Sequence, residues 1–225
     1  MRLLFFDMEF ADGRVPGSIY SIGYLVTDEH FRVLIPPTDV LIHPDSTWND
    51  YVVAKILAYP KAEVEAAPKF PAHYKKLKKL FAKADLAVGF AVGNDVRALR
   101  KDCERYELAP LSFRTLDMEK LCKLQDEHKD AHGLGGYVRA WCGEDPKNQH
   151  RSDGDALATM MLLRAICEQK HVTPSMILEA FPDSCGVSMQ KEKKKTTKPK
   201  RSFFRRRRPR KKKTEGKDAQ PSPKS

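Results

Sequence analysis

The segment Phe5-Phe6-Asp7-Met8-Glu9-Phe10 places two carboxylates, two residues apart, at the end of an apolar run. The residues from Leu3 to Phe6 are continuously hydrophobic, which is typical of a strand that is covered on both faces in a sheet flanked by helices. Because alternate side chains of a strand share a face, Asp7 and Glu9 would point the same way. Adjacent buried carboxylates are costly unless cations neutralise them, and hard divalent cations prefer oxygen ligands. The segment predicts a metal site, with two exposed acids at a solvated strand end as the alternative.

The net charge of +11 is concentrated at one end of the chain. From Gln190 to Ser225 there are 11 lysines and 6 arginines against three acids, a formal charge of +14, so the first 189 residues carry −3. We expect one folded domain over residues 1–183 and a disordered basic tail over 184–225, because the tail has almost nothing apolar to bury. Such a tail binds polyanions by releasing counterions from phosphates. Its candidate nucleic-acid contacts are Lys193, Lys194, Lys195, Arg205, Arg206, Arg207, Arg208, Lys211, Lys212 and Lys213. In a nucleated cell the same run could instead act as an import signal.

The cysteine pattern and the apolar segments bear on location. Five cysteines are widely spaced, without a Cys-x-x-Cys pair, which indicates reduced thiols in a cytoplasmic protein. The chain shows no signal-peptide pattern and no apolar stretch of about 18 residues. We therefore expect no membrane partner.

The element pattern favours an α/β fold. Residues 18–26 and 31–35 are rich in β-branched and aromatic residues and are separated by a short polar turn, which predicts a hairpin. Helical spacing follows over residues 71–84, then a buried strand over 86–90, a helix after it and a strand over 112–116. The remainder reads as helices over 118–124, 134–141, 155–169 and 175–180. This predicts a mixed central sheet of about five strands, the first three antiparallel, flanked by helices.

Two later segments carry further acids and a histidine. Asp95 follows the fourth strand, where a favourable charge at a helix N-terminus would explain it by itself. Near the end of the folded part, Ser152 and Asp155 have the spacing of a capping box for the last long helix. The capping box leaves His150 without a role.

Taken in order, these positions resemble the DEDDh exonucleases. This is the ribonuclease H-like family that includes the proofreading exonuclease subunit of bacterial DNA polymerase and ribonuclease T, and the resemblance covers about residues 1–170. The matching residues are Asp7 and Glu9 in the first motif, Asp95 in the second, and His150 and Asp155 in the third. Gly23 also fits the second strand of that family. Ala11-Asp12-Gly13 stands where the family commonly has Thr-Gly, a departure that concerns how the terminal nucleotide is seated.

The resemblance implies a metal-dependent 3′–5′ exonuclease that releases nucleoside 5′-monophosphates from DNA or RNA, most readily from single-stranded 3′ ends. It implies two Mg²⁺ or Mn²⁺ ions held by Asp7, Glu9, Asp95 and Asp155, with His150 as general base. Two alternatives stay open, because a fold does not guarantee activity. One is a non-catalytic nucleic-acid-binding protein associated with a polymerase or ribosome, and the other is a proofreading subunit that its tail tethers to a larger machine. The sequence leaves the choice between DNA and RNA and the oligomeric state open.

Overall fold

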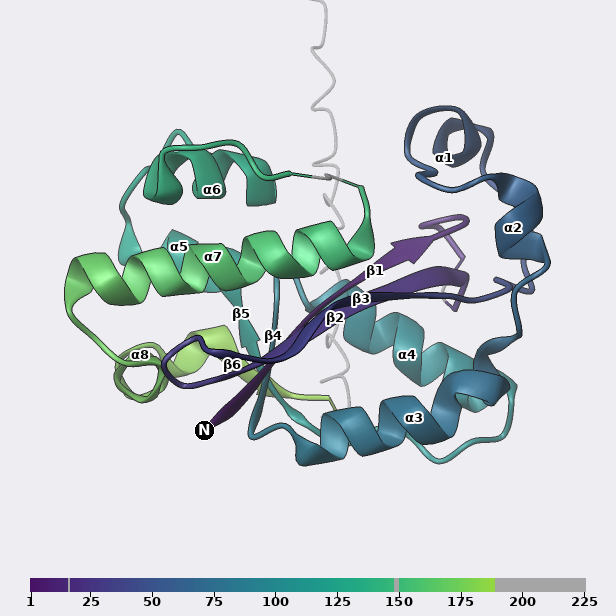
Figure 1. The fold of residues 1–225 in the computed structure, drawn as a ribbon, viewed down its shortest axis with the longest axis horizontal. Helices are drawn as coiled ribbons and strands as arrows, with labels where there is room; N and C mark the ends of the chain where they lie inside the picture. Colours follow the sequence, from purple (N-terminus) through teal and green to yellow (C-terminus); the bar gives the residue numbers. More distant parts are fainter. Residues whose placement is uncertain (16, 148–149, 189–225) are drawn as a thin grey trace, which may run out of the picture. The chain divides into compact units, whose positions relative to one another are not determined.

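A mixed sheet of six strands with helices on both faces forms the described part of the computed structural model, which covers residues 1–15, 17–147 and 150–188 (Figure 1). The strands are β1 (Arg2–Phe10), β2 (Ile19–Asp28), β3 (Val33–Leu41), β4 (Leu86–Gly89), β5 (Arg114–Asp117) and β6 (Cys185–Val187). The helices are α1 (Asp50–Lys55), α2 (Lys61–Glu65), α3 (Phe70–Lys83), α4 (Gly93–Arg105), α5 (Met118–Gln125), α6 (Gly133–Cys142), α7 (Ser152–Lys170), α8 (Pro174–Ala180) and the short 3₁₀ helix η1 (Pro182–Ser184).

The strand order is β3-β2-β1-β4-β5-β6. β2 pairs antiparallel with both β1 and β3, β4 and β5 run parallel to β1, and β6 returns antiparallel to β5. This confirms the predicted α/β class and the predicted antiparallel start. It also places β1 between an antiparallel and a parallel neighbour, so its carboxyl end meets the chain segments that follow β4.

Both faces of β1 are buried, which explains its unbroken apolar run. Leu3 and Phe5 pack in the core beneath α5, α6 and α7, whereas Leu4 and Phe6 pack in the core formed with α3 and α4. Figure 1 shows α7 across one face of the sheet and α3 and α4 on the other. Odd-numbered side chains of β1 therefore face α7.

Two features differ from the sequence-based expectation. The sheet has a sixth strand, because β6 contains only three residues and is too short to show a periodic pattern. It pairs with β5 beyond residue 183, where we expected the folded domain to end. Helices α1 and α2, in the connection between β3 and α3, are likewise short and were not predicted.

Among the described residues, no helix is both long and apolar enough to cross a membrane. The predicted nucleic-acid contacts between Lys193 and Lys213 lie outside the described residues.

Candidate active site

Three of the predicted metal ligands converge at the carboxyl end of β1. Asp7 and Glu9 lie on the face of β1 that is turned toward α7, and Asp155 comes from the first turn of α7. Carboxylate oxygens of all three lie within 4.8 Å of one another. A set of oxygen ligands at this spacing suits a hard divalent cation.

Gly23 fixes the position of α7 above the sheet. A Cβ at this position would lie 1.9 Å from the carbonyl carbon of Ser152 and 2.0 Å from the backbone nitrogen of Asp153. Only a glycine allows so close an approach of two backbones. Because Gly23 is opposite Asp7 in the sheet register, the contact also sets the distance from Asp155 to β1.

A buried hydroxyl pair strengthens the same contact. Ser152 is fully buried, and its hydroxyl shares a hydrogen bond with the hydroxyl of Ser21 on β2. Its oxygen also lies 3.0 Å from Oδ1 of Asp39 on β3, to which the Ser21 hydroxyl donates. The first residue of α7 is thereby bound to two strands.

The predicted capping box is wrong for Ser152. The N-cap of α7 is Arg151, which makes no side-chain cap hydrogen bond, and Ser152 is already helical. Its hydroxyl is engaged with Ser21 and Asp39 instead. Asp155 does reach back over the helix start, because its Oδ2 accepts a hydrogen bond from the backbone N–H of His150 at 3.2 Å.

Burial and mutual repulsion raise the pKa values of the acids. The pKa of Asp7 is raised well above its ordinary value, first by burial and then by Asp95, Glu9, Asp155 and Asp39. Burial, followed by the charges of Asp155 and Asp39, raises the pKa of Glu9 to about 8. Every one of these causes opposes ionisation, whereas a bound divalent cation would favour the ionised carboxylates and lower their pKa values. The carboxylates present therefore fit a divalent ion.

Asp95 lies beside the cluster, in the first turn of α4. It is only 4% exposed, so an exposed charge at a helix N-terminus does not account for it. Burial raises its pKa first, followed by the charges of Glu9 and Asp117. It is outside the group of three whose oxygens lie within 4.8 Å, yet its charge raises the pKa of Asp7.

His150 differs from the acids in exposure and in backbone conformation. It is exposed, lies just before α7, and has a left-handed φ of 65°. Its backbone N–H and its charge both lower the pKa of Asp155, against the larger effect of burial. The segment thus anchors one ligand of the cluster through its backbone while its side chain stays accessible.

Asp39 is a fifth acid that the sequence analysis missed. In the sheet register Asp39 lies opposite Gly23, which itself lies opposite Asp7, so the two carboxylates are separated by a residue without a side chain. Tyr59 and Ser21 both donate hydrogen bonds to Asp39. No local motif marks this residue, because its position depends on the pairing of three strands.

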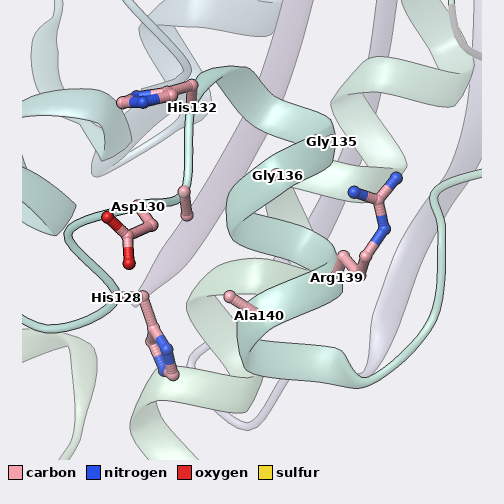
Figure 2. Close-up of a pocket in the computed structure, with 8 residues that line it drawn as sticks. His128, Asp130, His132, Gly135, Gly136, Arg139 and Ala140 are labelled. Carbon is pink, nitrogen blue, oxygen red and sulfur yellow. The ribbon is translucent and has the colours of Figure 1, made fainter.

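A cavity elsewhere on the protein is lined by none of these acids. It has a volume of about 720 Å³ and lies beside α6 and the loop that precedes it. Figure 2 shows Arg139 on the opposite side of α6 from His128 and Asp130, and the Arg139 guanidinium is paired with Asp145. The polar groups of this cavity do not converge, so it is not the candidate reaction centre.

The sequence over residues 4–163 matches the family described as Exonuclease, the RNase T family. The match covers well over half of the chain, so the protein belongs to the exonuclease family. The predicted membership of an exonuclease family is confirmed, and with it the expectation of an enzyme. Among curated proteins, none matches the sequence significantly.

Solved exonuclease structures share the fold at low sequence identity. The chain matches exonuclease X, bound to duplex DNA with a 5′ overhang, with a TM-score of 0.59 and 17% identity over 79% of this chain and 98% of that one. It matches Escherichia coli exonuclease I, bound to a dT13 oligonucleotide, with a TM-score of 0.67 and 16% identity over 80% of this chain and 43% of that one. It also matches the nuclease domain of 3′hExo, a DEDDh family member bound to rAMP, with a TM-score of 0.61 and 13% identity over 75% and 92% of the two chains. The chain therefore spans less than half of exonuclease I.

Proposed function

We propose that this protein is a divalent-metal-dependent 3′–5′ exonuclease that releases nucleoside 5′-monophosphates from DNA or RNA. The observation that carries the proposal is the convergence of Asp7, Glu9 and Asp155, whose carboxylate oxygens lie within 4.8 Å of one another. The family match supports it. So do the solved structures of exonuclease I with an oligonucleotide and of 3′hExo with rAMP.

In this proposal, four acids hold two Mg²⁺ or Mn²⁺ ions. Asp7, Glu9 and Asp155 would hold one ion, and Asp95, beside Asp7, would hold the other. When bound, such ions activate a water and stabilise charge on the phosphate and on the departing 3′-oxygen. The protein contributes the fixed arrangement of the carboxylates, since they lie on β1, α4 and α7.

His150 accepts the proton of the attacking water. Imidazole is the side chain most often used as a general base, and the exposed position of His150 leaves its ring accessible to substrate. The backbone hydrogen bond from His150 to Asp155 keeps the histidine segment next to the cluster.

The direct test is a time course on single-stranded DNA and RNA of one sequence, each labelled at the 5′ end, with and without EDTA. We expect a ladder shortening from the 3′ end, and no reaction in EDTA. Asp7→Asn should lower the rate by on the order of 10³-fold, because metal stabilisation of the transition state amounts to several kcal/mol.

Two results would exclude this proposal. Equal rates with and without EDTA would exclude a role for a metal ion in the reaction. Equal rates for Asp7→Asn and the original protein would exclude a role for the acid cluster. Circular dichroism of Asp7→Asn controls for folding. Failure of the original protein to degrade either substrate would favour the non-catalytic nucleic-acid-binding alternative.

We further propose that the basic tail, taken to begin after β6, gathers substrate for the acidic folded part. Deleting residues 190–225 should raise KM and flatten its salt dependence, with kcat little changed, because the tail's phosphate contacts are lost. Kinetics at several salt concentrations measure this. Equal salt slopes for the two proteins would refute substrate capture and leave a polymerase or ribonucleoprotein partner as the tail's target.

All five cysteines are free thiols, in keeping with a proposed cytoplasmic location.

A further inference from the structure

A groove of about 270 Å³ lies between the end of β1, the loop that follows it and the start of α4. Its lining residues come from the last residue of β1, from the loop after it and from the N-terminal half of α4; they are Phe10, Gly13, Arg14, Val15, Asn94, Arg97 and Ala98. Phe10 directly follows Glu9, and Asn94 directly precedes Asp95. Two of the groove's lining residues are therefore chain neighbours of proposed metal ligands.

One wall of the groove presents a guanidinium on a rigid support. The Arg14 side chain is 79% exposed, yet its Nε and Nη2 donate to the two carboxylate oxygens of Asp12 at 3.0 and 2.9 Å. Asp12 is 5% exposed, and the Ser18 hydroxyl donates to its backbone oxygen at 2.8 Å. Two of the five N–H donors of arginine go to Asp12, so the others are left for a ligand. Because Asp12 offsets the charge, Arg14 offers oriented donors more than net charge.

The other wall carries a second oriented guanidinium. Arg97 is exposed on α4, and its Nη2 donates to Oδ1 of Asn94 at 2.6 Å. None of the groove's lining residues is acidic, whereas the cluster on the α7 side of β1 contains Asp7, Glu9 and Asp155. The surface thus changes from carboxylates to guanidiniums across the end of β1.

We propose that this groove binds the phosphodiester backbone on the 5′ side of the scissile bond, with Arg14 and Arg97 donating to its phosphates. This inference rests on the proposed function. The nucleoside that leaves from a 3′ end brings no phosphate besides the scissile one, which the metal site takes. Each nucleotide on the 5′ side brings a further phosphate, and planar guanidinium forks match phosphate oxygens. The partly buried ring of Phe10 offers an apolar surface to the sugar or base between them.

The test compares two substrates of the full-length protein that differ in the 5′-side strand. The p-nitrophenyl ester of thymidine 5′-monophosphate has a scissile phosphodiester but no nucleotide on that side, whereas the thymidine trinucleotide with a 5′-phosphate has two. Arg14→Gln and Arg97→Gln are measured beside Arg164→Gln, a control in which an exposed arginine on α7 loses its ion pair with Glu168. A trinucleotide is short enough to keep the contribution of the basic tail small.

We expect each groove variant to lower kcat/KM for the trinucleotide about tenfold, mainly through KM, which is typical for loss of a charge-assisted hydrogen bond. Hydrolysis of the ester should be unchanged, and Arg164→Gln should behave as the original protein on both substrates. Equal losses on both substrates, or no loss on the trinucleotide, would overturn the groove assignment. If the original protein with Mg²⁺ hydrolysed neither substrate, the proposed function itself would fail, and the inference would fail with it.

Discussion

The acid cluster and the segment that carries His150 are held in different ways. Asp7, Glu9, Asp95 and Asp155 lie on β1, α4 and α7, and their carboxylates are buried or partly buried. His150 lies on a connecting segment, is exposed, and adopts a left-handed backbone conformation. The arrangement of the acids is therefore part of the folded core, whereas the imidazole contributes little to packing. An exchange in the first region should disturb the fold as well as chemistry, and an exchange of His150 should disturb chemistry alone.

His150→Gln should give the largest separation of the two effects. We expect kcat to fall by about 10²- to 10³-fold, the usual contribution of a general base. Mn²⁺ affinity and the melting temperature should stay unchanged, because the His150 side chain is exposed and its backbone N–H still reaches Asp155. Single-turnover kinetics, calorimetric Mn²⁺ titration and thermal melting measure the three quantities. A loss of Mn²⁺ affinity equal to the loss of kcat would make His150 part of the metal site and end the distinction.

Gly23→Ala should damage the other region. The new Cβ would lie 1.9 Å from the backbone of Ser152, so α7 must move. We expect a loss of roughly 1 to 3 kcal/mol in unfolding free energy. Displacement of Asp155 by such a shift should lower activity by up to about 10²-fold.

Gly93→Ala is the matched control for Gly23→Ala, because no atom lies within 4 Å of a Cβ built there. Urea unfolding and oligonucleotide hydrolysis compare the two variants. Retention of full activity and stability by Gly23→Ala would show that α7 is not seated as described.

The smallest expected effect is a pH dependence of metal-free stability. The pKa of Glu9 rises from 4.5 to about 8 in the folded protein, so between these values the folded chain holds a proton that the unfolded chain has released. Stability from this group is therefore greatest at low pH and is lost as the pH rises toward 8. In EDTA, the melting temperature should fall by a few degrees from pH 5.5 to 8.0, and Glu9→Gln should make this fall shallower. Exposed Glu179→Gln is the control, and a pH slope unaffected by Glu9→Gln would contradict the raised pKa.

Much of the fold could be predicted because its signals are local. The apolar run of β1, the β2–β3 hairpin and the spacing of α3 and α7 are each visible within about ten to twenty residues. The order of Asp7, Glu9, Asp95, His150 and Asp155 was recognised as a motif pattern. The convergence of three of these acids then follows from the fold that the motif pattern implies.

What the sequence could not predict depends on distant contacts. The hydroxyl of Ser152 contacts that of Ser21, 131 residues away, so the capping box that the spacing of Ser152 and Asp155 offered as an alternative is not formed by Ser152. Asp39 joins the cluster only through the register of three strands. The three residues of β6 form a strand only because β5 provides a partner.

The central claim is that carboxylates from distant parts of the chain form one divalent-ion centre. Anomalous diffraction from crystals grown with Mn²⁺ tests it most directly. We expect Mn²⁺ peaks coordinated by Asp7, Glu9 and Asp155, with Asp7 and Asp95 reaching a second ion. Mn²⁺ bound elsewhere on the protein, with the Asp7 and Asp155 carboxylates free of it at saturating metal, would contradict the account.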